Sequence, residues 1–170
     1  MGNKLPAFIL TDCTLAVPGA GGNRIGQVSE ITIPVMEKTI ESFRNGGMIK
    51  PREVAMGYEI TTASFKETAL DPDMLKLYGF GNAESIIAYG SMRSEDGTEH
   101  AARFEMVCDV KSVDMGNWTS AQKGEVSYGL SVHEGILYID DAEVYAFDDF
   151  GVRVGGVEQF PGRRAALRLD

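Results

Sequence analysis

The side chains that could perform acid–base or metal chemistry are few in this sequence. Its two histidines, His100 and His133, have no carboxylate or cysteine at a spacing typical of metal ligands. Two carboxylate pairs, Asp140-Asp141 and Asp148-Asp149, could hold a cation or share a proton, but adjacent aspartates more commonly mark solvated turns. The serine-hydrolase motif G-x-S-x-G and the zinc-protease motif H-E-x-x-H are both missing. We therefore expect no enzyme activity, no catalytic residue, no metal and no cofactor.

A glycine-rich segment and two cysteines complete the candidate chemistry. Residues 19–24 begin like a dinucleotide-binding loop, but Arg24 stands where the third glycine belongs and no helix is expected to follow. We predict a flexible connector at residues 18–23. Cys13 and Cys108 are far apart and no C-x-x-C motif occurs. Because Cys108 lies within an apolar alternation, we predict that it is a small buried hydrophobic residue.

Composition excludes several classes of protein. The 170 residues suit a single domain spanning residues 1–170, and a net charge of −9 argues against a surface that grips nucleic acid. That charge does not exclude a surface past which nucleic acid slides, because repulsion prevents adhesion. The first twelve residues contain an apolar run too short for a signal peptide or a membrane span, and Pro6 breaks the myristoylation motif. We expect no membrane anchor.

Hydrophobic periodicity and turn residues predict a mainly β chain with one short helix. We predict an antiparallel β-sandwich or open barrel in which about eight strands are joined by short turns. The helix is expected at residues 71–79, with Asp71 as N-cap, Pro72 in the first turn and Met74, Leu77 and Tyr78 on its apolar face. The strands are expected at residues 5–17, 24–33, 36–43, 53–65, 85–93, 102–113, 125–133, 136–139 and 143–147.

Three of these strands alternate clearly between apolar and polar residues, so each should bury one face. The residues expected to face the core are Val54, Met56, Tyr58 and Ile60 in the first, Phe104, Met106, Cys108 and Val110 in the second, and Val126, Tyr128, Leu130 and Val132 in the third. The opposite face of the first strand is unusually small and acidic. It carries Glu53, Ala55, Gly57, Glu59 and Thr61.

The loop before that strand, residues 44–52, is too long for a tight hairpin turn. Asn45, Gly46 and Gly47 make its backbone flexible, Met48 and Ile49 place apolar side chains at its tip, and the surrounding charges are all basic: Arg44, Lys50 and Arg52. A monomer gains nothing from an apolar tip on a long arm, whereas a subunit that grips its neighbour does. The predicted inter-subunit contacts are Phe43, Arg44, Gly46, Gly47, Met48, Ile49 and Lys50.

Residues 28–60 resemble the major tail tube proteins of contractile-tailed bacteriophages and of related tailocins with R-type pyocin-like tubes. Those proteins carry a T-[LI]-P segment, a Y/F-R-x-G-G-M loop and a V-x-M-G-x-E strand, which here begin at Thr32, Phe43 and Val54. Later segments also look alike, from Asp114 to Trp118, from Asp141 to Asp148 and from Arg163 to Leu169. The order of these motifs is more specific than any one of them. Departures are the longer loop at residues 18–23, Glu158 in place of Asp, and Arg168 in place of Gly.

The resemblance implies a self-assembling structural protein of a virion or tailocin tail, made in the cytoplasm of a bacterial host. Subunits would form six-fold rings whose strands join into one barrel, and the rings would stack into the inner tube of a contractile sheath. Implied partners are further copies of the chain, the sheath, baseplate and terminator proteins, and a tape measure protein and DNA in the lumen. The acidic face from Glu53 to Thr61 would line that lumen, and residues 44–52 would reach the next ring. The alternative is a small soluble β-barrel that binds a ligand in its interior.

Overall fold

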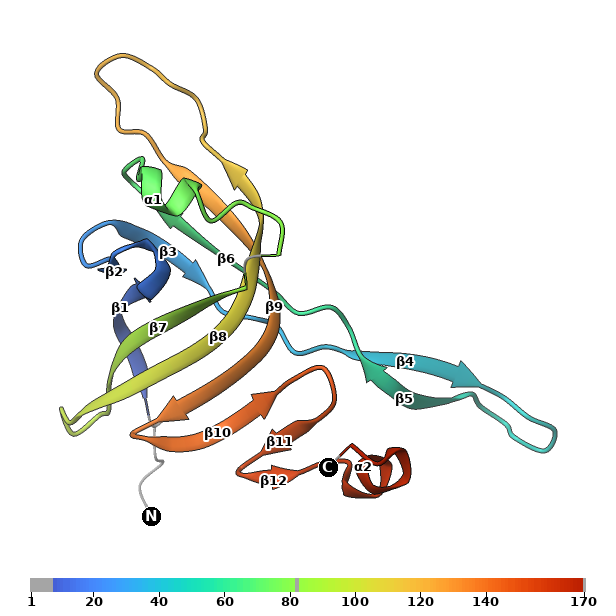
Figure 1. Cartoon of the computed structure of the whole chain (residues 1–170). Coiled ribbons are helices and arrows are strands. Elements are labelled where there is room, and N and C mark those ends of the chain that lie inside the picture. Colours follow the sequence, from blue (N-terminus) through green and yellow to red (C-terminus); the bar gives the residue numbers. More distant parts are fainter. Residues whose placement is uncertain (1–7, 82, 170) are drawn as a thin grey trace.

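The computed structural model, which describes residues 8–81 and 83–169, consists mainly of antiparallel strands (Figure 1). The helical segments are the 3₁₀ turn η1 (Pro18–Ala20) and the short helices α1 (Pro72–Leu75) and α2 (Pro161–Leu167). The strands are β1 (Ile9–Val17), β2 (Gly22–Asn23), β3 (Val28–Thr32), β4 (Lys38–Phe43), β5 (Arg52–Tyr58), β6 (Thr62–Glu67), β7 (Glu84–Arg93), β8 (Glu99–Asp114), β9 (Val126–Ile139), β10 (Ala142–Phe147), β11 (Val152–Val154) and β12 (Val157–Glu158).

Ten of the strands form one antiparallel sheet that branches at β9. Its main path runs β12-β11-β10-β9-β8-β7-β1-β2, while β6 pairs with β9 and β3 pairs with β6. The first half of β9 pairs with β6 and its last residues pair with β10, so this one strand joins the two branches. No hydrogen-bonded ladder among the described residues joins β3 to β1, so the barrel stays open. The predicted mainly β, antiparallel open architecture is confirmed.

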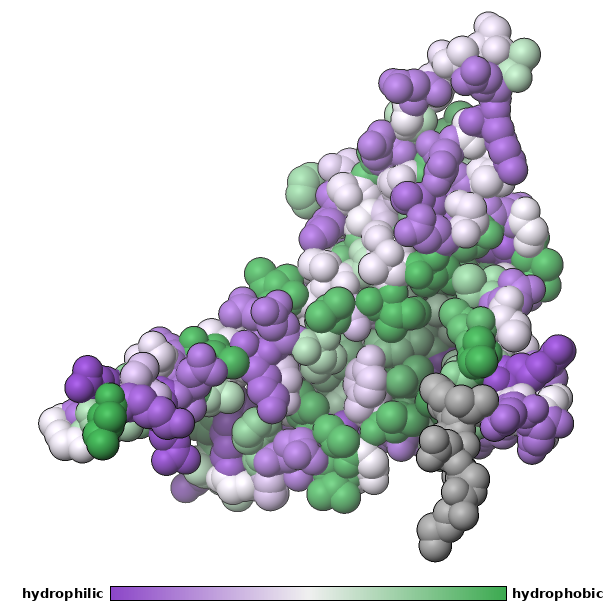
Figure 2. All heavy atoms as spheres, turned by 180° about the vertical axis from the view of Figure 1, so that it is seen from behind, coloured by the Kyte–Doolittle hydropathy of each residue, from purple (hydrophilic) through white to green (hydrophobic). Residues whose placement is uncertain are grey.

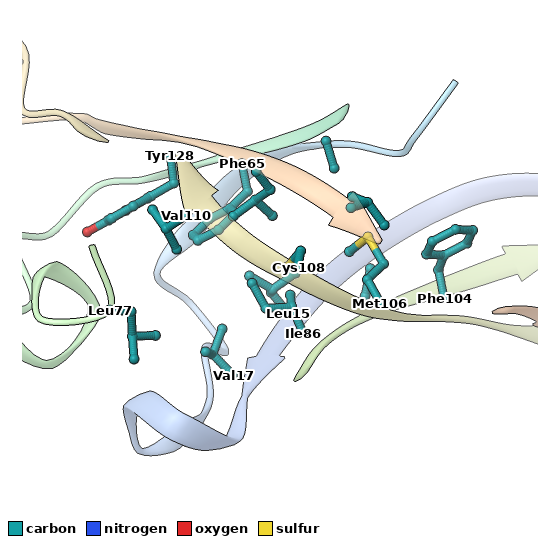
Figure 3. Close-up of a cluster of buried hydrophobic side chains, with 14 of the residues drawn as sticks. Leu15, Val17, Phe65, Leu77, Ile86, Phe104, Met106, Cys108, Val110 and Tyr128 are labelled. Atoms are coloured by element: carbon teal, nitrogen blue, oxygen red, sulfur yellow. The ribbon is translucent and has the colours of Figure 1, made fainter. Parts of the chain in front are cut away.

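The core lies inside this curved sheet, where β8 and β9 contribute alternate residues (Figure 3). All eight residues predicted to face inward from these two strands are buried, including Cys108. The rings of Phe65 and Tyr128 stack with centroids 4.8 Å apart. Large side chains therefore fill the interior of the open barrel.

Helix α1 covers one end of the core. Its N-cap is the predicted one, because an Asp71 side-chain oxygen accepts a hydrogen bond from the Asp73 N–H at 2.8 Å. The helix ends at Leu75 and is shorter than predicted. Met74 and Leu77 are buried against the barrel, but Tyr78 is exposed, so its assignment to the covered face was wrong.

Turn chemistry was predicted correctly at the two hairpins flanking β8 and β9. Gly97 adopts a φ of 85° in the turn between β7 and β8. Asp140 and Asp141 have φ values of 50° and 63° in the two-residue turn between β9 and β10, where such a turn requires positive φ. Both aspartates are exposed, as the solvated-turn reading predicted.

The predicted strand at residues 53–65 is instead two strands, because the chain leaves one sheet and enters another. Residues 53–58 pair with β4 in a separate two-stranded sheet, whereas residues 62–65 belong to β6 in the main sheet. The prediction that this apolar face is core holds for Tyr58, which packs against the core, and was wrong for Val54, Met56 and Ile60. Met56 is 64% exposed and Ile60 is 82% exposed, and no third strand among the described residues pairs with β4–β5.

Three smaller differences concern element boundaries. Residues 125–133 and 136–139 form one continuous strand, β9, because Gly135 is accommodated against Phe104 and Phe147 without a break. Residues 18–20 form the turn η1 within the segment predicted to be irregular. Helix α2 was not predicted. The N-terminal predictions fall partly on residues 1–7, outside the described residues. Within residues 8–81 and 83–169, no helix has the length and apolarity needed to cross a membrane.

Candidate interaction surfaces

Each histidine pairs with one aspartate from a neighbouring part of the sheet. His100 Nδ1 lies 2.6 Å from Asp140 Oδ2, and His133 Nε2 lies 3.0 Å from Asp109 Oδ2. The hydrogen bond from His100 lowers the pKa of Asp140, and the backbone N–H of Ala101 stabilises the same carboxylate. The pairs are 24 and 40 positions apart, so spacing could not reveal them. The described residues contain no group of three potential metal ligands. Each His–Asp pair instead links neighbouring parts of the sheet.

The arm, defined as β4, β5 and the connecting residues 44–51, projects away from the main sheet (Figure 1). Six ladder positions hold its strands together, from Lys38 opposite Tyr58 to Phe43 opposite Arg52. An isolated two-stranded hairpin is only marginally stable in water. Its exposed apolar side chains are Ile40, Phe43, Ile49, Val54 and Met56. We conclude that the arm has the composition of a surface that another molecule covers.

The residues predicted to form one small, acidic face are divided between the two faces of the arm. Glu53, Ala55 and Gly57 are all exposed, and cross-strand pairing places Ser42 beside Glu53 and Ile40 beside Ala55. Glu59 lies just beyond β5, where its Oε1 accepts a hydrogen bond from the Thr39 hydroxyl at 2.8 Å. The register shift between Thr39 and Ile40 interrupts the alternation, so Glu53 and Ala55 share a face with Ile40, whereas Gly57 and Glu59 lie on the opposite face with Thr39.

Thr61 is separate from both of these faces because it lies where the chain enters the main sheet. It is buried, and its carbonyl accepts a hydrogen bond from the Val132 N–H at 3.0 Å. The alternation that links Thr61 to Glu59 in the sequence is interrupted between β5 and β6.

At the arm tip, Ile49 is 94% exposed, the most accessible apolar side chain of the arm. Met48 is folded back: its N–H donates to the Asn45 carbonyl, its own carbonyl accepts from Arg44 Nε at 3.0 Å, and its sulfur lies 3.4 Å from the Asn45 nitrogen. Gly47 adopts a φ of 87°, which favours glycine. The remaining predicted contact residues, Phe43, Arg44, Gly46 and Lys50, are all exposed. The tip thus presents Ile49 surrounded by basic side chains.

A groove of about 800 Å³ opens at the base of the arm, between β5, β9 and the segment from β10 to α2. Its exposed apolar side chains are Met56, Ile60, Phe150 and Phe160. Carboxylates at Glu59, Asp148 and Asp149 also line it, together with Lys38 and Arg163. Seen from behind the view of Figure 1, apolar residues gather across the middle of the molecule, while the upper loop is mostly hydrophilic (Figure 2).

Sequence reasoning missed the C-terminal wall of this groove, which helix α2 supports. Arg163 donates from Nη1 to the Phe150 carbonyl at 2.9 Å and so fixes the β10–β11 turn to the helix. Pro161 in the first turn was the available signal. At the other end, Arg168 is left-handed with φ 53°, the conformation that glycine takes after many helices. Because Arg168 stands where related proteins have Gly, the sequence lacks the glycine that commonly marks a helix end.

Among the described residues the main sheet has three unpaired ends, at β1 with β2, at β12 and at β3. Beyond β7, the outer edge of β1 forms ladder pairs with β2 at Ala16 and Val17 alone among the described residues, and Ile9 and Leu10 on this strand are exposed. At the far end, β12 pairs only with β11 and is two residues long. Unpaired edges of this kind are templates for pairing with another chain.

A buried ionic cluster stabilises the barrel end beneath α1. Arg24 is 3% exposed, forms ion pairs with Asp71 and Glu67, and donates from Nη2 to the Ala20 carbonyl at 2.7 Å. Burial raises the pKa of Glu67, and no described group donates a hydrogen bond to either of its carboxylate oxygens. The hydrogen bond from Arg24 lowers the pKa of Asp71. Arg24, which the sequence placed at the start of a strand, lies before β3 and is a structural residue of this cluster.

Comparison with known families gives one match that covers almost the whole chain. The family model described as phage tail tube protein FII matches residues 9–167. No curated protein matches the sequence.

Three solved structures have a similar fold. The chain matches the PVC sheath/tube terminator of an extracellular contractile injection system with a TM-score of 0.59 and 12% identity, over 81% of this chain and 99% of that one. It matches the PVC sheath-tube complex with a TM-score of 0.55 and 10% identity, over 74% and 87% of the two chains. It matches a chain of the anti-feeding prophage (AFP) baseplate with a TM-score of 0.54 and 9% identity, over 81% of this chain and 97% of that one. At these identities the structures establish a shared fold.

Proposed function

The chain belongs to the phage tail tube protein FII family and is a structural subunit of a tail tube, and from this premise we propose that it assembles into stacked six-membered rings around a lumen. The observation that carries the proposal is the arm, whose apolar side chains have no cover in the single chain. Burying each such side chain at an interface contributes roughly 1.5–3 kcal/mol. Assembly supplies the cover that the arm lacks.

Ring formation follows from the open sheet. A contact between its β1 end and the β12 end of a neighbour is heterologous, so a row of subunits keeps one unused edge at each of its two ends until the ring closes. Closure gives both of these edges a partner and produces one continuous barrel. In this proposal the whole chain acts as one tube domain with an inter-ring arm.

Within the tube, the arm has two proposed roles. Its tip contacts the adjacent ring through Phe43, Arg44, Gly46, Gly47, Met48, Ile49 and Lys50. Its small and acidic residues, Glu53, Ala55, Gly57 and Glu59, line the lumen, where small side chains leave room and carboxylates repel phosphate. Thr61 is left out of the lumenal surface because it is buried within the subunit.

The proposed partners follow from the tail context. The solved structures of similar fold come from a sheath/tube terminator, a sheath-tube complex and a baseplate, so we assign sheath, terminator and baseplate contacts to this chain as well. A tape measure protein and DNA are the proposed occupants of the lumen. Assembly would take place in the bacterial host cytoplasm before the particle is released.

Neither alternative function has comparable support. A ligand-binding barrel needs interior space, but Phe65, Tyr128 and Phe104 fill the interior here. The family is structural, and the two His–Asp pairs have no nucleophile or third group placed beside them among the described hydrogen bonds.

Negative-stain microscopy of the purified protein, alone and with its tail partners, tests the proposed assembly directly. Rings or tubes with a central hole are expected. Replacing both Met48 and Ile49 with Ser should leave the thermal unfolding midpoint unchanged and shorten or abolish the tubes. The matched control is Ile25→Ser, which removes an exposed apolar side chain outside the arm and should leave tube length unchanged. A protein that stays monomeric at high concentration, even beside its tail partners, would contradict the proposal.

A further inference from the structure

The groove at the base of the arm has the chemistry of a receptor rather than of ordinary surface. Four apolar side chains from three different parts of the chain, Met56, Ile60, Phe150 and Phe160, converge on it while remaining exposed. A hydrogen bond from Arg163 to the Phe150 carbonyl holds one wall in position. An apolar hollow with charged residues at its rim is typical of a protein interaction site.

We propose that this groove receives the arm tip of a second copy of the chain, with Ile49 seated among its apolar residues. The proposal rests on the assembly proposed above and names the surface that the arm grips.

Charge supports the choice of occupant. Three carboxylates line the groove, at Glu59, Asp148 and Asp149, against two basic residues, Lys38 and Arg163. Arg163 already donates to a backbone carbonyl within the groove wall. The arm tip carries the opposite balance, because all three charged residues among positions 44–52 are basic. An apolar side chain ringed by cations therefore matches an apolar hollow with a carboxylate excess.

The tip that fills the groove must come from another molecule. The nearest β5 residue of the groove, Ala55, is six positions from Ile49, so at about 3.3 Å per residue the extended hairpin holds the tip roughly 20 Å from the groove of its own chain. Donor and receptor are thus at opposite ends of one hairpin. A contact between them is heterologous and repeats from copy to copy, as stacking requires.

Disulfide trapping between separately purified variants tests the seat of Ile49. All variants carry Cys13→Ser, because Cys13 is exposed, whereas Cys108 is buried and burial raises its pKa to about 12, so it does not react. A tagged Ile49→Cys protein is mixed with Phe150→Cys and, as the matched control, with Trp118→Cys on the exposed β8–β9 loop. Mild oxidation should cross-link the tagged chain to Phe150→Cys roughly tenfold more than to Trp118→Cys, because docking raises the effective concentration of the two thiols.

Charge reversal supplies an independent measurement. Asp149→Lys should shorten the tubes, and combining it with Lys50→Glu should restore part of their length. A mere loss of folding would not be reversed by a second change on the arm.

Micrographs of the same samples separate failure of this site from failure of the tube function. Tubes without the Ile49–Phe150 cross-link, or with an equal or greater yield to Trp118→Cys, would overturn the docking site and leave the tube assignment standing. If the unmutated protein forms no rings or tubes, either alone or with its tail partners, both the assembly and the docking site would be overturned.

Discussion

The barrel and the arm are built from strands with the same alternating pattern, yet they treat their apolar residues in opposite ways. Along β8 and β9, every second side chain is buried by the facing strands and by α1. Along β5, Val54 and Met56 alternate just as regularly and stay exposed, because β4–β5 is a sheet of only two strands. Alternation of apolar and polar residues thus identifies the apolar face of a strand, but it does not show whether residues of the same chain bury that face.

The ionic groups of the two regions differ in the same sense. Arg24, Glu67 and Asp71 form a cluster within the barrel end, where Arg24 and Glu67 are inaccessible to solvent. On the arm, Glu53, Lys50 and Arg52 stay in solvent. The charged groups of the barrel end form ion pairs within the fold, whereas these charged side chains of the arm are exposed to solvent.

The largest expected effect is on the apolar residues themselves. Phe65→Ala should lower the free energy of unfolding by about 3–5 kcal/mol, because it leaves a cavity beside Tyr128. Met56→Ala removes a comparable apolar side chain from the arm and should leave unfolding of the monomer nearly unchanged while reducing tube yield. Denaturant unfolding and microscopy measure the two quantities. Equal losses of stability in both variants would refute the contrast between barrel and arm.

Removing Arg24 tests the buried cluster. Arg24→Ala leaves the Glu67 carboxylate buried without a counter-charge and should cost about 3–5 kcal/mol of unfolding free energy. Arg93→Ala is the matched control, because the Arg93–Glu99 pair is exposed and such pairs contribute about 0–1 kcal/mol. Chemical denaturation would contradict the structural role of Arg24 if the two variants were equally stable.

Reversing charge on the arm should change transport rather than stability. If Glu53 and Glu59 line the lumen, replacing both with Lys gives passing phosphates something to bind and makes the interaction depend on salt. Particles that assemble from this variant should release DNA more slowly, most clearly at low salt. The same pair of changes at Glu41 and Glu95, exposed residues outside the proposed lumenal set, is the control. Release at the unmutated rate at low salt would count against a lumenal position.

The smallest expected effect is a pH dependence that arises in the barrel alone. Burial raises the pKa of Glu67 above its ordinary value of 4.5, so the unfolded chain ionises this group first as pH rises. The contribution of Glu67 to stability is therefore full below pH 4.5 and is lost as pH rises through its folded pKa. Glu67→Gln should flatten this part of the stability curve. An unchanged slope between pH 4.5 and 7, measured by denaturant unfolding, would show that another group is responsible.

The sequence by itself determined the antiparallel β class, the inward residues of β8 and β9, the cap of α1 and both hairpin turns. Each depends on neighbours in the chain: a period of two along a strand, a carboxylate two residues from the N–H that it caps, or a turn residue that tolerates positive φ. It also identified Ile49 as an exposed apolar tip, since a flexible, basic loop cannot bury it locally.

Only the tertiary structure decided the rest. It divided residues 53–65 between two sheets, left Met56 and Ile60 exposed, buried Thr61 and Arg24, and assembled the groove from segments as far apart as Met36 and Arg163. Strand pairing and burial depend on contacts between distant residues, and local periodicity carries no information about which strand supplies the partner. The same physics explains why the alternation along β5 did not reveal that Val54 and Met56 stay exposed in this chain.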